Sequence, residues 1–216
     1  MTVGQEIADK TGLRVLHNHR PIDLVLPFFE FGSPPFGRLV HEFRRRLIEE
    51  VAASDLPGLI FTFVWAFDQR DDHEALEHYA QPFRTRGGRV LCVELQASQQ
   101  ERLRRNRCAS RLAAKPSKRD LEASTRDLLD LDAEYRLNSD GEFDSRDDYL
   151  RLDNTNIPAR QVAGQVIDHF TLTMSRLNSV QQTIPCGTSG FNRSAGSGVA
   201  QAFLLSDCVR LWLASR

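Results

Sequence analysis

Two short apolar runs in the first hundred residues constrain the fold of this chain more than any other feature. "GLIFTFVW" (Gly58 to Trp65) and "RVLCVEL" (Arg89 to Leu95) are rich in β-branched and aromatic residues and show little alternation with polar ones. Runs of this kind are typical of strands buried on both faces of a parallel sheet. "LRVLH" (Leu13 to His17) and "YLRLD" (Tyr149 to Asp153) predict two further strands.

Helical patterns alternate with these strands. They cover Phe36 to Ala53, about Asp72 to Arg86, Ser98 to Arg107, Ser117 to Arg136 and Pro158 to Phe170. Ser98 with Glu101, and Ser117 with Asp120, have the spacing of helix-capping residues. An earlier helical stretch, "MTVGQEIADKTG", opens the chain and ends at Gly12. The alternation predicts an α/β fold with a doubly wound parallel sheet and helices on both faces, in three layers.

Composition narrows the function classes. The formal net charge of the 216 residues is -1, so no overall field favours nucleic acid or an anionic membrane. No apolar stretch approaches the length of a membrane span, and no signal-peptide pattern opens the chain, which predicts a cytoplasmic location. The four cysteines lie far apart and form no zinc-binding pattern, so we expect reduced structural thiols and no metal site.

The last 46 residues, 171–216, depart from the α/β rhythm. They are rich in Ser, Thr and Gly through "TIPCGTSGFNRSAGSG" and then end in the apolar "VAQAFLLSDCVRLWLASR". We expect a domain over residues 1–170 followed by a poorly ordered tail. A late helix packed on the domain, or an out-of-frame extension, are the alternatives.

Candidate functional residues follow the predicted strands, because ligands of open parallel sheets bind beyond the carboxyl ends of the strands. "HNHRPID" follows the first strand, and we expect His17, His19 and Asp23 to line a substrate pocket rather than to bind a metal. Asp68 follows the fully apolar strand and could orient Mg²⁺ or a nucleophilic hydroxyl, although a turn or cap role is equally compatible with its position.

The segment "ERLRRNRCASRLAAKPSKRD" concentrates positive charge at one helix end and the following loop. Its cations are Arg102, Arg104, Arg105, Arg107, Arg111, Lys115, Lys118 and Arg119. Arginine binds phosphate oxygens in a bidentate manner, so one interpretation is a mobile phosphate-binding loop. The other is a solvated surface that the acidic helix "DLEASTRDLLDLDAE" neutralises.

Taken in order, these segments resemble the small-molecule and nucleotide kinases of the P-loop NTPase superfamily, such as shikimate kinase, gluconate kinase and adenylate kinase. "TVGQEIADKTGLRVLHNH" is similar to the helix after the phosphate loop and the strand that follows it. "RLRRNRCASRLAAKPSKR" is similar to the lid, and "LRLDNTNIPARQVAGQVIDHF" to the last strand, base-binding loop and final helix. The resemblance covers about residues 1 to 170.

The resemblance implies a site for each component of phosphoryl transfer from ATP with Mg²⁺. Arg107 and Arg111 would hold the transferring phosphate and Asp68 would orient metal or acceptor. Thr2 would lie beside the phosphate loop, and the loop from Asn154 through Thr155 and Asn156 to Pro158 would contact the adenine. The acceptor, a small molecule, would bind His17, His19, Asp23 and Arg38.

The sequence departs from this family in one respect. Such kinases carry a strand and a G-x-x-x-x-G-K-[ST] motif ahead of the first helix, and this sequence contains no such motif. We therefore expect a chain that begins inside the phosphate loop, lacks the central strand of the sheet and has little activity. The alternative is a non-catalytic interaction protein that retains a kinase-like fold. A nucleic-acid binder is disfavoured because the arginine segment has no interleaved aromatic residues.

Overall fold

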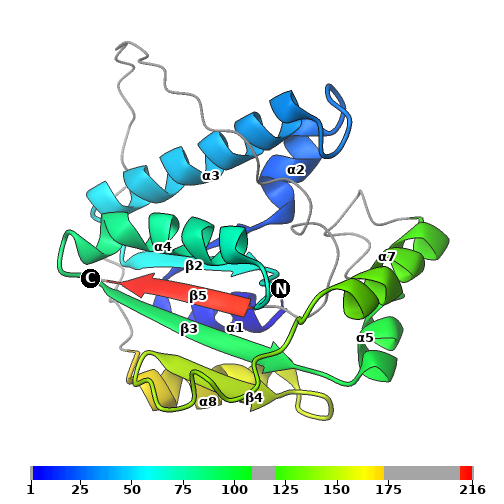
Figure 1. Ribbon diagram of the computed structural model, residues 1–216. Helices are drawn as coiled ribbons and strands as arrows, with labels where there is room; N and C mark the ends of the chain where they lie inside the picture. Colours follow the sequence, from blue (N-terminus) through cyan, green and yellow to red (C-terminus); the bar gives the residue numbers. More distant parts are fainter. Residues whose placement is uncertain (1, 109–119, 173–209, 216) are drawn as a thin grey trace.

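A computed structural model of the chain describes residues 2–108, 120–172 and 210–215, which form a mixed α/β fold around one five-stranded sheet (Figure 1). The strands are β1 (Arg14–His17), β2 (Gly58–Phe63), β3 (Arg89–Gln96), β4 (Tyr149–Asp153) and β5 (Arg210–Ser215). The helices are α1 (Thr2–Thr11), α2 (His19–Val25), α3 (Pro34–Ala53), α4 (Arg70–Arg84), α5 (Gln99–Asn106), α7 (Leu121–Glu134) and α8 (Ala159–Phe170).

The strand order is β1-β2-β5-β3-β4. β1 pairs with β2, and β3 with β4, in parallel, whereas β5 is antiparallel to both of its neighbours, β2 and β3. Four strands therefore run in one direction and β5 runs against them. All six residues of β2 are buried, in agreement with the prediction of a strand covered on both faces.

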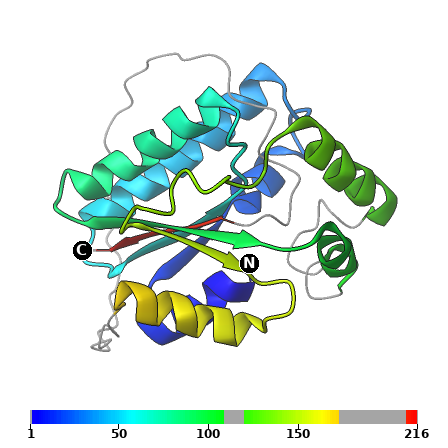
Figure 2. The same ribbon diagram turned by 60° about the horizontal axis from the view of Figure 1, so that its bottom comes forward.

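Helices cover both faces of the sheet (Figure 2). Ile48 of α3 and Tyr79 of α4 pack with Phe61 of β2 in the core of one face. Ile7 of α1 and Val166 of α8 belong to the core of the other face, together with Ile60, Val93 and Leu213. Successive residues of β2 thus point to opposite cores, as the pleat of a strand requires.

Local signals set several helix ends as predicted. The hydroxyl of Ser98 accepts a hydrogen bond from the backbone N–H of Glu101 at 3.3 Å, which caps α5. Gly12 has a φ of +78° and its N–H donates to the carbonyl of Ala8, so it ends α1 in the conformation that glycine adopts at least cost. Asp120 caps α7 through the N–H of Ala123, whereas the predicted start at Ser117 lies outside the described residues.

α2 is absent from the sequence-based prediction. The sequence predicts no helix between the first strand and Phe36, but His19–Val25 is a helix. Its apolar residues Ile22 and Val25 pack with Phe36 and Val40 of α3. Tertiary burial on α3 stabilises this short helix, whose length alone would not make it stable.

The structure differs from the expectation for residues 210–215, which were assigned to a poorly ordered tail and instead form β5. Leu211 and Leu213 join the core on the α1 and α8 face, and Trp212 and Ala214 join the core on the α3 and α4 face. β5 occupies the central position that the sequence analysis leaves vacant. β2 and β3 therefore do not have the unpaired backbone groups expected there.

None of the helices in the described parts of the chain combines the length and the apolar character needed to cross a membrane.

Candidate functional site

The carboxyl ends of the four parallel strands meet at one edge of the sheet, where ligands of such sheets bind. Asn18 follows β1, Ala66 lies beyond β2, Ser98 follows β3 and Asn154 follows β4. Two groups of polar side chains lie at this edge. One joins α5 to the segment after β4, and the other lies between α3 and α4 beyond β1 and β2.

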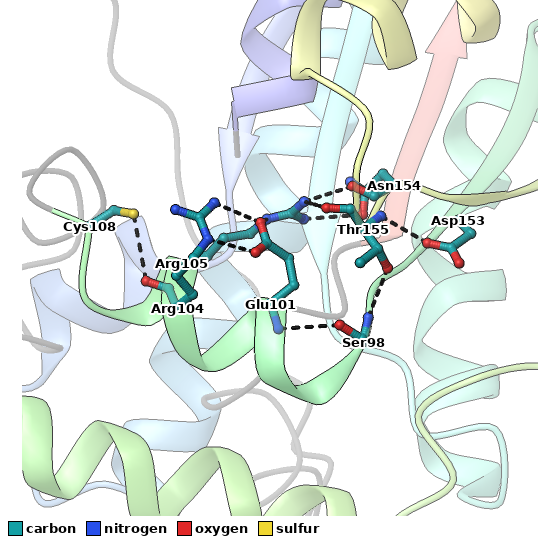
Figure 3. Close-up of polar contacts among 8 residues, drawn as sticks. All are labelled: Ser98, Glu101, Arg104, Arg105, Cys108, Asp153, Asn154 and Thr155. Atoms are coloured by element: carbon teal, nitrogen blue, oxygen red, sulfur yellow. Dashed lines mark hydrogen bonds and ion pairs between the residues drawn. The ribbon is translucent and has the colours of Figure 1, made fainter.

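The first group, here called the loop clamp, consists of Ser98, Glu101, Arg105, Asn154 and Thr155 (Figure 3). The guanidinium of Arg105 donates from Nη1 to Oδ1 of Asn154 at 3.1 Å. Its Nη2 donates to the backbone carbonyls of Asn154 at 2.7 Å and Thr155 at 3.2 Å. Arg105 Nε donates to Glu101 at 2.7 Å, which holds the guanidinium in place. One arginine therefore binds three acceptors of the loop and one on its own helix.

Other bonds fix the same loop from the strand side. The backbone N–H of Ser98 donates to Oγ1 of Thr155 at 3.0 Å, and the N–H of Asn154 donates to the carbonyl of Gln96 at 2.8 Å. Asp153 accepts from the N–H of Thr155 at 2.8 Å, and hydrogen bonds from Thr155 lower the pKa of Asp153. Asn154 is only 7% exposed, so the first predicted base-binding residue is held inside the loop rather than presented to solvent.

Three arginines of the segment, Arg102, Arg104 and Arg105, form ion pairs within the protein. Arg102 is buried and forms a bidentate pair with Asp132 of α7, which is part of the acidic helix. Arg104 and Arg105 both bind Glu101, and the hydrogen bond from Arg104 is the main cause that lowers the pKa of Glu101 to about 2. Only Arg102 is neutralised by the acidic helix, and it is buried rather than solvated. Arg104 and Arg105 are neutralised by Glu101 of their own helix.

Of the two arginines predicted to hold phosphate, Arg107 is exposed at the end of α5, and its side chain makes no hydrogen bond or ion pair within the described residues. Arg111 lies outside the described residues. The prediction that this pair binds phosphate therefore stays a prediction.

The second group, here called the buried polar cluster, consists of Asn18, His41, Arg44, Asp72 and Tyr79. Arg44 of α3 is 3% exposed and donates from Nη2 to the carbonyl of Asn18 at 3.4 Å. Burial lowers the pKa of Arg44, and the Tyr79 hydroxyl and the Asp72 charge oppose that shift. The Tyr79 hydroxyl also lies 3.0 Å from Nδ1 of His41. A buried arginine thus links the end of β1 to the helices on that face.

Asp72 was missed in the sequence analysis, which selected Asp68. Asp68 is exposed and accepts a hydrogen bond from the backbone N–H of Arg136 at 3.2 Å, so in this structure it ties the segment after β2 to the end of α7. Asp72 is 3% exposed and accepts from the N–H of Ala66 at 2.9 Å. Burial raises the pKa of Asp72 to about 6.

A signal for Asp72 was present in the sequence. Asp72 precedes Ala75, Leu76 and Tyr79 by three, four and seven residues, the spacing of one helix face. All four residues are buried on α4. A carboxylate on the apolar face of a helix, near its N-terminus, points toward the sheet rather than toward solvent.

The predicted acceptor residues come from neighbouring elements. His17 ends β1 and its Nδ1 lies 3.4 Å from Oγ1 of Thr62, while His19 is buried at the start of α2. Asp23 of α2 has a buried carboxylate oxygen, Oδ1, that lacks a hydrogen-bond partner among the described residues. Arg38 is exposed on α3, the helix against which α2 packs.

The remaining predicted nucleotide-binding residues are exposed. Thr2 is the first residue of α1, and Asn156 follows the clamped residue Thr155. Searches of protein-family models, curated proteins and solved structures returned no match to this chain. The assignment of function therefore depends on the geometry at the carboxyl edge.

Proposed function

We propose that this chain is related in architecture and ancestry to ATP-dependent small-molecule phosphotransferases of the P-loop kinase type. The observation that carries the proposal is the placement of α1. β2 and β3 follow each other along the chain but leave one sheet position between them, and α1 lies against that position. A Cβ built on Gly4 would lie 3.2 Å from Leu211 of the central strand and 3.7 Å from Thr62 of β2.

The polarity of α1 supports the same proposal. Gly4 in its first turn is near Thr62, at the carboxyl end of β2, so the N-terminus of α1 lies at the edge where the candidate site is. A helix N-terminus favours anions, and the first turn of α1 contains no acidic residue that would repel phosphate. In P-loop kinases the helix after the phosphate loop is placed in this way.

The residues of this chain are better suited to contact the base of ATP than to hold its phosphates. The loop clamp gives the segment after β4 a defined backbone, on which the exposed Asn156 could contact a base. At the phosphate end, no G-x-x-x-x-G-K-[ST] sequence supplies the lysine and hydroxyl that hold the β- and γ-phosphates and Mg²⁺. We therefore assign no catalytic step to this chain's residues.

Calorimetric titration of the full chain tests the proposal. ATP should bind saturably, and Asn156→Ala should weaken binding while the exposed control Arg70→Ala should not. If Mg²⁺-ATP produces no saturable heat with a chain whose circular dichroism shows it to be folded, the nucleotide-binding proposal is wrong.

A specific observation favours a second candidate, a non-catalytic interaction protein with this fold. β5 runs antiparallel, so its first residue, Arg210, pairs with Phe63 and Glu94 near the carboxyl ends of β2 and β3. A strand in this direction cannot continue from that edge into α1, as the strand before a phosphate loop must. A folded chain that binds no nucleotide would support this candidate.

A further inference from the structure

β5 fills the middle of the sheet (Figure 1). Its six residues pair with Gly58–Phe63 on one side and with residues 89–94 on the other, both antiparallel. A central strand satisfies two rows of backbone groups that would otherwise be open sheet edges. The position between β2 and β3 is therefore a binding site for one extended segment of chain.

The site requires apolar side chains on both faces of that segment. Leu211, Leu213 and Ala214 are at most 1% exposed, and Trp212 is 4% exposed. Trp212 meets the ring of Phe83 edge-on, with the ring centroids 5.8 Å apart. The position between β2 and β3, here called the slot, thus fits an extended segment in which leucines alternate with a tryptophan and an alanine.

Two glycines adapt the walls of the slot to the backbone of β5. A Cβ on Gly58 of β2 would lie 1.9 Å from the carbonyl oxygen of Ala214, and one on Gly88, just before β3, would lie 2.7 Å from that of Ser215. Both distances are well inside van der Waals contact. Side chains at these positions would block the end of the strand, so the slot fits β5 in this register.

β5 is also the strand most separated in sequence from the rest of the sheet. Residues 173–209 lie between the end of the described α8 region and Arg210, whereas the backbone partners of β5 all belong to β2 and β3. The slot is therefore formed by one part of the chain and filled by another. The same contacts form whether the strand comes from the same molecule or from a second one.

We propose that the position between β2 and β3 is a strand-acceptor site, and that the partner it fits is the β5 strand of a second copy of this chain. Exchange of an identical element is a low-cost route to a dimer because each copy keeps its native contacts. Main-chain hydrogen bonds provide affinity and the alternating side chains provide specificity. The inference does not depend on nucleotide binding.

A peptide experiment tests whether the slot accepts a strand in trans. The probe is a fluorescein-labelled peptide with the sequence VRLWLASR, residues 209–216, added to the full chain and followed by fluorescence anisotropy. The control peptide carries Leu211→Asp and Leu213→Asp. In a Leu213→Ala chain, whose own strand is weakened, the wild-type peptide should bind about tenfold or more tightly than it binds the wild-type chain.

Two results of the peptide experiment would overturn the proposal. One is equal binding of the wild-type and Asp-substituted peptides. The other is no binding of the wild-type peptide to a folded Leu213→Ala chain.

A dimer experiment tests the identity of the partner. The full chain, partly unfolded in denaturant and refolded at high concentration, should yield a species of twice the monomer mass by light scattering, and an excess of the wild-type peptide should suppress it. Gly58→Ala should abolish the dimer because its Cβ blocks Ala214, whereas Gly164→Ala, with no atom within 4 Å of the new Cβ, should not.

If Gly58→Ala does not fold, suppression by the peptide decides the matter. A chain that stays monomeric at every concentration, or a dimer that the peptide leaves intact, would show that a second copy is not the partner.

Discussion

Arg105 and Asn154 lie 49 residues apart in the sequence and are joined by two hydrogen bonds, of 3.1 Å to the side-chain oxygen and 2.7 Å to the backbone carbonyl. The first residue belongs to α5 and the second follows β4, so the pair ties a helix to the loop at the carboxyl edge of the sheet. Hydrogen bonds from a guanidinium are stronger than neutral ones, and the planar group satisfies several acceptors at once. The pair therefore sets the conformation of the loop.

Replacing Arg105 with lysine should loosen this loop. Lysine keeps the charge but cannot reach the two carbonyls, Oδ1 of Asn154 and Glu101 together. We expect faster amide exchange in residues 154–157 and a free energy of unfolding lower by about 1–2 kcal/mol. Hydrogen exchange and urea denaturation measure the two effects. The control Arg107→Lys, at an exposed position, should change neither, and unchanged exchange in Arg105→Lys would refute the role of the clamp.

Asp72 should make stability fall as the pH rises from about 4 to about 6. Its folded-state pKa of about 6 is above the usual value of 3.8, because burial disfavours the carboxylate. The folded state therefore holds more protons over that range, and the charge costs up to about 3 kcal/mol above pH 6. Asp72→Asn should remove this part of the pH dependence in urea titrations.

The control for this pH dependence is the exposed Asp130 of α7, whose charge is not among those that shift the pKa of Asp72. Asp130→Asn should follow the wild type across the same range. Identical pH profiles for the wild type and Asp72→Asn would show that the carboxylate of Asp72 is as well solvated in the folded state as in the unfolded one.

His41 should make stability fall as the pH falls, which is opposite to the effect of Asp72. Burial, and next the charge of His78, lower the pKa of His41 below its usual 6.5. The unfolded state then binds more protons, so the stability present above pH 6.5 is lost as the pH falls through that value. His41→Gln should lose less stability between pH 7 and pH 5 than the wild type, measured by thermal unfolding. His169→Gln, at an exposed site on α8, serves as the control, and equal losses in His41→Gln and the wild type would contradict the prediction.

Leu213→Ala should strongly destabilise the chain. Leu213 is 1% exposed in the central strand, and removing a buried leucine side chain costs about 2–5 kcal/mol. The exposed Leu24, at 56%, provides the matched control, and Leu24→Ala should change stability by less than about 0.5 kcal/mol. Similar urea midpoints for both variants would mean that β5 is not part of the cooperative core.

The elements formed by strong local patterns were predictable from the sequence. β4 has the predicted bounds, and β2 and β3 differ from theirs by one or two residues at the carboxyl end. The cap at Ser98 and the stop at Gly12 were read from residue types whose hydrogen bonds are made within a few positions. Such signals are contained in short stretches of chain and can therefore be recognised without knowledge of the tertiary structure.

The candidate site was less predictable. Candidate residues could be placed after each strand, but not assigned as exposed or buried. Asp68 and Asp72 are four residues apart, yet one is exposed and binds the backbone of Arg136 while the other is buried with a raised pKa. Arg105 is one of eight cations in its segment. Its role depends on the loop after β4, whose carbonyls it binds, and the sequence does not show that contact.

The alternation of strands and helices could be predicted from the amino-acid sequence, because apolar periodicity and capping are local properties of a chain. The strand order and the identity of the central strand depend on contacts between distant segments and are known only from the folded structure. The segment "RLWLAS" is apolar between Arg210 and Ser215 and carries no signal that selects one sheet position over another. Its place between β2 and β3, opposite in direction to both, follows from the backbone groups and two cores that it satisfies there together.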